Sequence, residues 1–218
     1  MHPSPPVPPP SSAARRTSRL PRGARRQQLL QAAQDVFVAQ GFHAAAMDDI
    51  ADRAGVSKPV LYQHFPGKRE LYLALLEEHV SELADRVAEA MGTTDDNRAR
   101  VNAAVGAYFD FVDAEGEAFR LVFESDLRND AEVRQVVDEG AQKCIEAIAE
   151  VIAADTGAEP ERALLLATGM IGLAESSARG WLARKGTLSR DEAVSLMSAL
   201  AWRGISGFPR VDGHEHPA

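Results

Sequence analysis

The stretch from residue 47 to residue 68 constrains the fold most, because signals for two short helices alternate there with helix-breaking residues. Apolar residues at helical spacing predict a first helix that ends at Gly55, since glycine adopts the left-handed conformation without a steric penalty. Ser57 is a suitable N-cap for a second helix, which has a proline in its first turn and ends near Phe65. Two short helices joined by such a turn form a helix-turn-helix, which places its second helix in the major groove of DNA.

The net charge of −8 is unevenly distributed along the chain. Residues 1–70 hold ten Lys/Arg and five Asp/Glu, a net charge of +5, whereas the remainder holds 14 basic and 27 acidic residues, a net charge of −13. A basic head on an acidic body suits phosphate binding at one end. An accidental asymmetry in an acidic protein gives the same numbers, so charge alone does not separate the two explanations.

The composition also indicates the cellular compartment in which the protein is expected. A single cysteine, Cys144, excludes an internal disulfide and suits a reducing cytoplasm, where it is expected to be a buried small apolar residue. No run of 18 or more residues is continuously apolar, so we expect no membrane span. The proline-rich residues 1–10 lack the apolar segment of a signal peptide. We therefore expect a cytoplasmic protein.

Helical periodicity recurs along the rest of the chain, without an alternating strand pattern or a hairpin signal. It predicts an all-α fold of about nine helices, the first at about residues 22–40 and another at 117–127. Low apolar content predicts disorder before residue 22, where arginines can either reach DNA or remain solvated without a role. The expected parts are a tail rich in proline and arginine (1–21), a helix-turn-helix head (22–70), a body for effector binding and dimerisation (71–208) and a polar tail (209–218).

The segment from residue 163 to residue 182 is apolar on most sides, and such a helix must be covered all round. It also carries small residues that let another helix approach closely: Ala167, Gly169, Gly172, Ala174 and Ala178. A monomer could cover this helix only by wrapping it centrally, whereas a homodimer covers it by packing the last two helices against their copies. We expect the homodimer, which a helix-turn-helix head also favours.

The second helix of the helix-turn-helix holds the candidate DNA-binding residues. Lys58 can donate to guanine or to phosphate, and Gln63 can pair with adenine. Pro59 and Val60 can contact thymine methyl groups. Tyr62 is either a half-buried packing residue or part of the contact surface.

Two further candidates follow that helix. His64 can donate to phosphate or simply close the helix end. Lys68 opens the next helix, where its charge opposes the helix dipole and backbone donors favour an anion, so we expect it to bind phosphate. Arg69 beside it is expected to be solvated.

Aromatic residues of the body can line an apolar cavity for a small effector. The candidates are Tyr108, Phe109, Phe119, Phe123 and Trp181. Apolar residues at helical spacing are more often core, so each has both interpretations. No metal-ligand spacing, phosphate-binding loop, nucleophile elbow or cysteine pair is present, so we expect no metal, no cofactor and no enzymatic activity.

Several segments resemble the signature of the TetR family of bacterial transcriptional regulators: Gly41-Phe42, Met47 to Ala51, Ala54 to Ser57, Leu61 to Phe65, Lys68 and Leu71. The resemblance implies an all-helical homodimer, a three-helix head that binds a double-stranded DNA operator, a phosphate contact by Tyr62 and a body that binds a small effector. Ala45 and Ala46 depart from the family, which often has Thr or Ser just before the second helix.

A narrower resemblance covers residues 52–65, with looser support at 94–98, 109–111 and 120–124. These segments are similar to the actinobacterial regulators of fatty-acid synthase genes (the FasR type). That subgroup implies a long-chain acyl-CoA as effector and lipid-synthesis genes as targets.

Two alternatives remain open. One is an efflux regulator that responds to a drug-like cation, for which Asp110, Glu124 and Glu175 could serve. The other is a lipid carrier that does not bind DNA.

Overall fold

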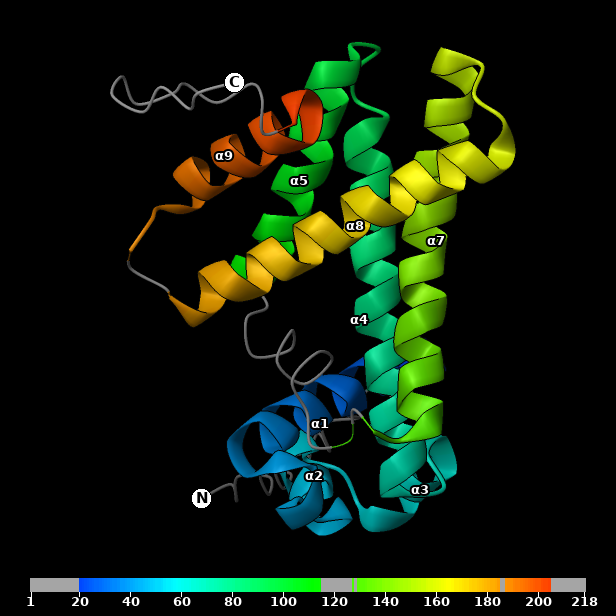
Figure 1. Cartoon of the computed structure of the whole chain (residues 1–218). Helices are drawn as coiled ribbons and strands as arrows, with labels where there is room; N and C mark the ends of the chain where they lie inside the picture. The colour runs from blue at the N-terminus through cyan, green and yellow to red at the C-terminus, as the bar shows by residue number, and fades with distance from the viewer. Residues whose placement is uncertain (1–19, 115–126, 128, 185–186, 205–218) are drawn as a thin grey trace, which may run out of the picture.

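The computed structural model describes residues 20–114, 127, 129–184 and 187–204. Within these residues the chain forms eight helices and no strand, which confirms the predicted all-α fold (Figure 1). Most of the helix expected at residues 117–127 lies outside the described residues. The helices are α1 (Arg22–Ala44), α2 (Met47–Ala54), α3 (Lys58–His64), α4 (Lys68–Met91), α5 (Asn97–Ala114), α7 (Ala131–Thr156), α8 (Pro160–Ala183) and α9 (Arg190–Arg203).

Local sequence signals set the ends of several helices. Gly55 and Gly157 follow α2 and α7 with φ angles of 65° and 67°, in the left-handed region that favours glycine. Asp130 caps α7, because its side chain accepts from two backbone N–H groups in the first turn. Ser189 and Glu192 form a capping box at the start of α9, each satisfying a backbone N–H group of the other.

The head consists of α1, α2 and α3, packed on the first turns of α4 (Figure 1). Its core contains the apolar stripes predicted for α1 and α2, including Phe37 and Ile50, which are 1% and 0% exposed. Tyr72 of α4 joins this core, and its ring lies 5.2 Å from the Phe37 ring in an edge-to-face contact. The head is therefore built directly onto α4 without a flexible linker.

The body is organised around α4 and α7, which run side by side and both begin at the head (Figure 1). Gly140 of α7 faces Val80 of α4 so closely that a Cβ atom at position 140 would lie 2.5 Å from the Val80 Cβ. The two helices pack as one unit because glycine leaves room for this approach. α8 crosses them, and α5 packs against α4, α8 and α9.

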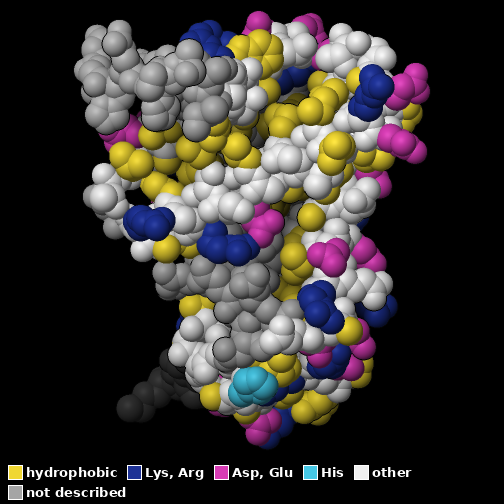
Figure 2. Space-filling view, in the orientation of Figure 1, with side chains coloured by type: hydrophobic (Ala, Val, Ile, Leu, Met, Phe, Trp, Pro, Cys, Tyr) yellow, Lys and Arg dark blue, Asp and Glu magenta, His cyan; other side chains and the backbone are white. Residues whose placement is uncertain are grey.

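The outer faces of α8 and α9 keep large apolar side chains exposed, and Figure 2 shows hydrophobic side chains gathered over this part of the molecule. Leu165 and Leu166 of α8 are 75% and 56% exposed, and Trp202 of α9 is 46% exposed. Cβ atoms added at Gly169 and Gly172 would meet nothing within 4 Å. An exposed apolar face with open space beside two glycines is the kind of surface that a dimer interface requires. Among the described helices, none combines the length and apolarity needed to cross a membrane.

Replacing Gly140 with alanine should force α4 and α7 apart, because the new methyl group would overlap the Val80 side chain. Overpacking of this kind costs roughly 1–3 kcal/mol. Urea denaturation at fixed protein concentration should show that loss in the free energy of unfolding. Gly23→Ala is the matched control, since a Cβ at position 23 meets nothing within 4 Å. Equal stability of the two variants would contradict the close approach.

Candidate functional site

The outward face of α3 carries the predicted DNA-binding residues. Leu61 and Phe65 anchor the helix in the head core with exposures of 0% and 2%. Tyr62 is 47% exposed, and Gln63 is also exposed. Tyr62 and Gln63 are thus exposed opposite the side that anchors α3 in the core. Lys58 and Pro59 are exposed in the first turn, while Val60 and His64 are half-buried.

Ser57 occupies the N-cap position of α3, but its side chain makes no capping hydrogen bond. Its backbone carbonyl accepts from the N–H groups of Val60 and Leu61 at 2.9 and 3.3 Å. The expectation of a side-chain cap is therefore wrong for this structure. The start of α3 depends instead on Pro59, whose fixed φ angle suits the first helical turn.

Lys58 is held by an acidic residue of the neighbouring helix. Its Nζ atom donates to Oδ2 of Asp48 in the first turn of α2 at 2.6 Å, and both side chains are more than half exposed. This hydrogen bond, followed by the charge of Asp48, raises the pKa of Lys58. This contact could not be predicted from the sequence, because residues ten positions apart on separate helices give no periodic signal.

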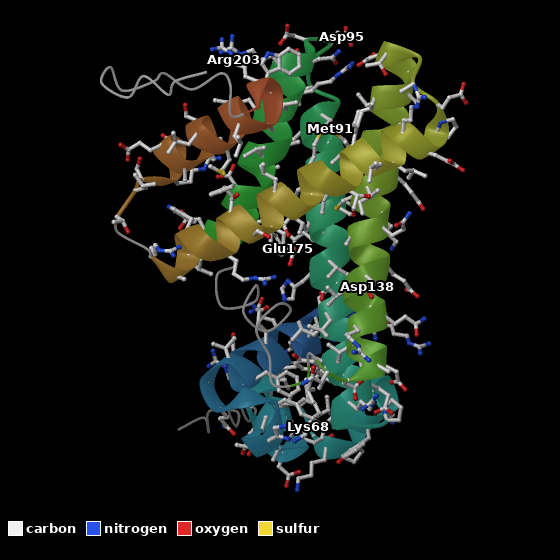
Figure 3. All side chains as sticks on the ribbon, viewed as in Figure 1. Lys68, Met91, Asp95, Asp138, Glu175 and Arg203 are labelled. Atoms are coloured by element: carbon white, nitrogen blue, oxygen red, sulfur yellow. The ribbon has the colours of Figure 1, made fainter. Side chains whose placement is uncertain are left out.

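Lys68 has a different set of partners from the predicted phosphate. Its Nζ atom donates to the backbone carbonyls of Phe42, His43 and Ala45 at 2.7, 3.2 and 2.9 Å. It also lies 4.6 Å from the centroid of the Phe42 ring. All three ammonium protons thus have acceptors at residues 42–45. Figure 3 shows Lys68 within the head. These hydrogen bonds fasten residues 42–45 onto the start of α4, and the phosphate contact expected of Lys68 stays a prediction.

Arginines of α1 border the α3 surface. The guanidinium of Arg26 lies 4.7 Å from the centroid of the Phe65 ring, at the end of α3. Arg25 donates to the side chain of Gln28, which in turn donates to the carbonyl of Ala54. These contacts place positive charge beside the helix-turn-helix and so support its predicted basic character.

Arg69 is paired rather than solvated, contrary to the expectation. It makes two hydrogen bonds to the carboxylate of Asp130, at 2.8 and 2.9 Å, and another to Glu132 at 3.0 Å. The Arg69 guanidinium lowers the pKa of Asp130, which also caps α7. This contact ties the first turn of α4 to the first turn of α7. Asp130 could have been predicted as a helix N-cap, because it directly precedes an apolar helical pattern.

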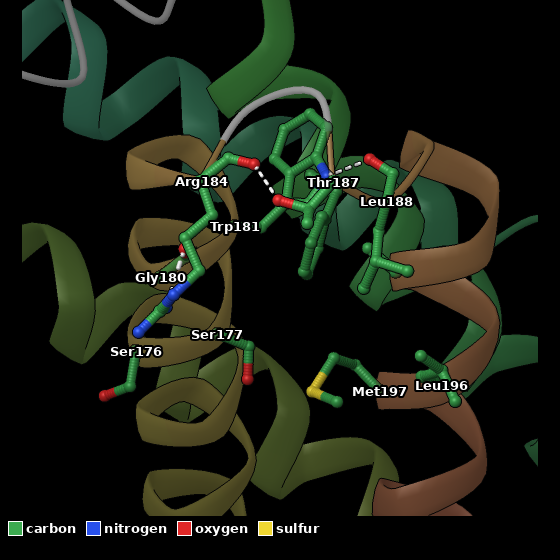
Figure 4. A pocket seen from close by; sticks show the side chains of 11 residues that line it. Ser176, Ser177, Gly180, Trp181, Arg184, Thr187, Leu188, Leu196 and Met197 are labelled. Atoms are coloured by element: carbon green, nitrogen blue, oxygen red, sulfur yellow. Dashed lines mark hydrogen bonds between the residues drawn. The ribbon is translucent and has the colours of Figure 1, made fainter.

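Phe109 and Trp181 lie together at a cavity of about 430 Å³ between α5, α8 and α9. Their ring centroids are 5.6 Å apart, and the Trp181 indole donates to the carbonyl of Leu188 at 3.0 Å (Figure 4). Leu188, Leu196 and Met197 add apolar surface to the wall. Serines and Arg184 supply its polar groups. The α9 side chains were missed because their pattern was assigned to dimerisation alone.

The other predicted effector residues are not brought to this cavity. Tyr108 is 3% exposed and lines a separate cavity of about 20 Å³ with Cys144 and Glu175. Phe119 and Phe123 lie outside the described residues. Burial raises the pKa of Tyr108, and burial raises that of the Cys144 thiol to about 11. Cys144 is therefore the buried, unreactive residue expected from the sequence.

Two of the acids considered for a cationic effector already have cationic partners. Asp110 pairs with Arg190 at 2.5 Å, and Glu175 pairs with Arg179 one helical turn away. Glu124 lies outside the described residues. In the described part of the chain, no group of three or more His, Cys, Asp or Glu side chains is arranged to hold a metal ion.

Comparison with known proteins covers both parts of the chain. Residues 29–75 match bacterial regulatory proteins of the tetR family, and residues 97–204 match a tetracyclin repressor-like C-terminal domain. The chain is 47% identical over 200 residues to the HTH-type transcriptional activator FasR of Mycolicibacterium smegmatis, covering 92% of this chain and 91% of that protein.

Solved structures agree with this picture. A TetR-like transcriptional regulator from Rhodococcus sp. RHA1 is 31% identical and superposes with a TM-score of 0.67, covering 87% of this chain and 100% of that one. The regulator FadR from Bacillus subtilis in complex with stearoyl-CoA is 16% identical, with a TM-score of 0.70 over 82% of this chain and 98% of its own. At that identity the second likeness concerns the fold alone.

Replacing Lys68 with methionine should lower the free energy of unfolding by about 1–3 kcal/mol, because three backbone carbonyls lose a charged donor. Lys58→Met removes the same charge from an exposed ion pair and should change stability by less than about 0.5 kcal/mol. Urea denaturation of both variants at one protein concentration makes the comparison. If Lys68 served only phosphate binding, the two variants would be equally stable.

Proposed function

Because the chain belongs to the TetR family of bacterial regulatory proteins, we propose that a homodimer offers its two α3 helices to successive major grooves of a palindromic operator. DNA-binding transcriptional regulation is the function of this family. The half-sites would lie about one helical turn apart, as two symmetric heads require. The relative from Mycolicibacterium smegmatis is named an activator, and we propose the same direction of control for this chain.

The observation that carries the proposal is the division of α3 into two sides. Leu61 and Phe65 fix the helix in the core, while Tyr62 and Gln63 remain exposed. A rigid helix with an exposed polar face can enter a groove without reorganising the head. Gln63 can read adenine, and Tyr62 can donate to a phosphate.

Dimerisation through α8 and α9 is supported by their exposed apolar faces. Leu165, Leu166 and Trp202 would leave water on pairing, which is favourable in proportion to the apolar area buried. Gly169 and Gly172 would let a second α8 approach closely, since nothing in the described chain occupies the space beside them. A packed pair of these two helices would make a four-helix bundle and hold the two heads in a fixed relation.

For the effector we propose a long-chain acyl-CoA acting on lipid-synthesis genes, as the resemblance to the FasR type implies. A cavity of about 430 Å³ walled by Phe109, Trp181 and Met197 is in the size range of small-molecule sites and suits an apolar chain. Arg184 in its wall offers a cation for an anionic group of the ligand. The pairing of Asp110 and Glu175 with arginines disfavours the cationic alternative.

Signalling to the head would pass through α4, which belongs to both parts. Arg69 joins α4 to the start of α7, so the two helices would shift together near the head. An effector that tilts them changes the separation of the two α3 helices and hence operator affinity. The effector can shift the equilibrium between the two helix arrangements only by the difference between its binding free energies for them.

Operator binding can be tested with a DNA duplex selected by the wild-type protein from a random pool. The Kd measured by fluorescence anisotropy should rise steeply with salt, because phosphate contacts release counterions. Gln63→Ala and Tyr62→Ala should each weaken binding by roughly tenfold or more. Gln142→Ala, an exposed change on α7, is the control and should leave the Kd unchanged. A Kd insensitive to salt and to both α3 variants would contradict the proposal.

Effector binding can be tested in a Trp202→Phe variant, in which Trp181 is the remaining tryptophan. Oleoyl-CoA, titrated below its critical micelle concentration, should change the Trp181 emission saturably, because this ring forms part of the cavity wall. A second change, Ser177→Phe, fills the cavity and should abolish the response while the circular dichroism stays the same. Saturable binding of the cationic dye rhodamine 6G without a response to oleoyl-CoA would favour the efflux alternative.

A further inference from the structure

We propose that Asp48 is a specificity-determining residue, which restrains Lys58 and thereby weakens binding to non-operator DNA. The inference rests on the proposed use of the α3 surface for DNA binding. Its structural basis is the 2.6 Å hydrogen bond from the Lys58 ammonium to the Asp48 carboxylate, across the turn of the helix-turn-helix.

The position of Asp48 explains why this carboxylate matters. It is the second residue of α2, two positions after Ala46, which occupies the N-cap position and provides no side-chain cap. Backbone donors at such a helix start would otherwise favour an anion such as a DNA phosphate. Asp48 and its neighbour Asp49 put negative charge there instead, where it complements the α2 dipole. Phosphate approaching this edge of the head therefore meets like charge.

The ion pair also limits what Lys58 contributes to non-specific binding. Such binding depends on cations that neutralise phosphates and release counterions. A lysine already neutralised by a carboxylate at 2.6 Å releases fewer of them. The pair is exposed, with 59% and 56% of the two side chains accessible, so its value lies in competition with phosphate more than in stability.

Operator binding is affected less, because an ammonium has three protons. Lys58 can keep one hydrogen bond to Asp48 while donating to the acceptors of guanine in the major groove. In that arrangement Asp48 orients the ammonium toward the bases. The Asp48 carboxylate thus weakens contacts between Lys58 and phosphates, which depend on charge alone. It permits hydrogen bonds from Lys58 to guanine, which depend on a directed donor, and a repulsive group of this kind adds selectivity.

The test compares Asp48→Asn with wild-type protein on two duplexes of equal length, one selected from a random pool by the wild type and one scrambled. Asp48→Asn should tighten binding to the scrambled duplex, steepen its salt dependence by about one phosphate contact and lower the specificity ratio about five- to tenfold. Asp49→Asn is the matched control, since it removes the same charge from the same turn of α2. It should leave the ratio within about twofold of the wild-type value.

A protein that already carries Lys58→Ala distinguishes two effects of Asp48: its restraint of Lys58 and its direct repulsion of DNA phosphates. In this background, Asp48→Asn should no longer change the ratio. An equal loss of selectivity in Asp49→Asn, or an unchanged ratio in Asp48→Asn, would overturn the inference while leaving operator binding intact. A wild-type protein with no preference between the two duplexes would contradict the proposed function as well. Urea denaturation checks that each variant is folded.

Discussion

The Lys68 ammonium donates to three carbonyl oxygens at the end of α1, and the position of the whole head depends on this contact. These carbonyls follow Gly41, where a φ of 76° and a ψ of 163° interrupt α1, and a buried carbonyl needs a donor that the interrupted helix does not supply. Because Lys68 is also the first residue of α4, the same interaction joins the three-helix head to the long helix of the body. Phe37 and Tyr72 add an aromatic contact across the same junction. The head therefore moves with α4, which any control of DNA binding by the body requires.

The second consequence concerns α7, which accompanies α4 along the body. Close approach at Gly140 and Val80 fixes the two helices in their middle, and Arg69 with Asp130 fixes them at the head. A change in the body that displaces α7 would then also displace α4. The cavity walled by Phe109 and Trp181 lies among α5, α8 and α9, which pack against this pair or against one another. Under the proposed function, ligand binding, dimer geometry and operator affinity would be linked through packed helices rather than through one contact.

Local features could be predicted from the sequence, and contacts between distant residues could not. Gly55 and the periodic apolar residues act within a few positions, so the helix-turn-helix, its buried side and its exposed side follow from spacing. The acceptors of Lys68 lie up to 26 residues away and are backbone atoms, which leave no trace in the residue pattern. Arg69 and Asp130 are 61 residues apart, and only the packing of α4 beside α7 brings them together. Tyr108 and Phe109 are adjacent on α5, and their directions into two cavities depend on how α8 crosses that helix.

Photo-cross-linking from position 62 tests most directly whether α3 is the surface that meets DNA. The light-activated tyrosine analogue p-azidophenylalanine would replace Tyr62 in one protein and Gln142, on the exposed side of α7, in another. With labelled operator DNA, the account predicts a covalent protein–DNA product from position 62 and none from position 142. Cross-links from α7 without cross-links from position 62 would contradict it, because DNA would then bind a face other than the one formed by α3.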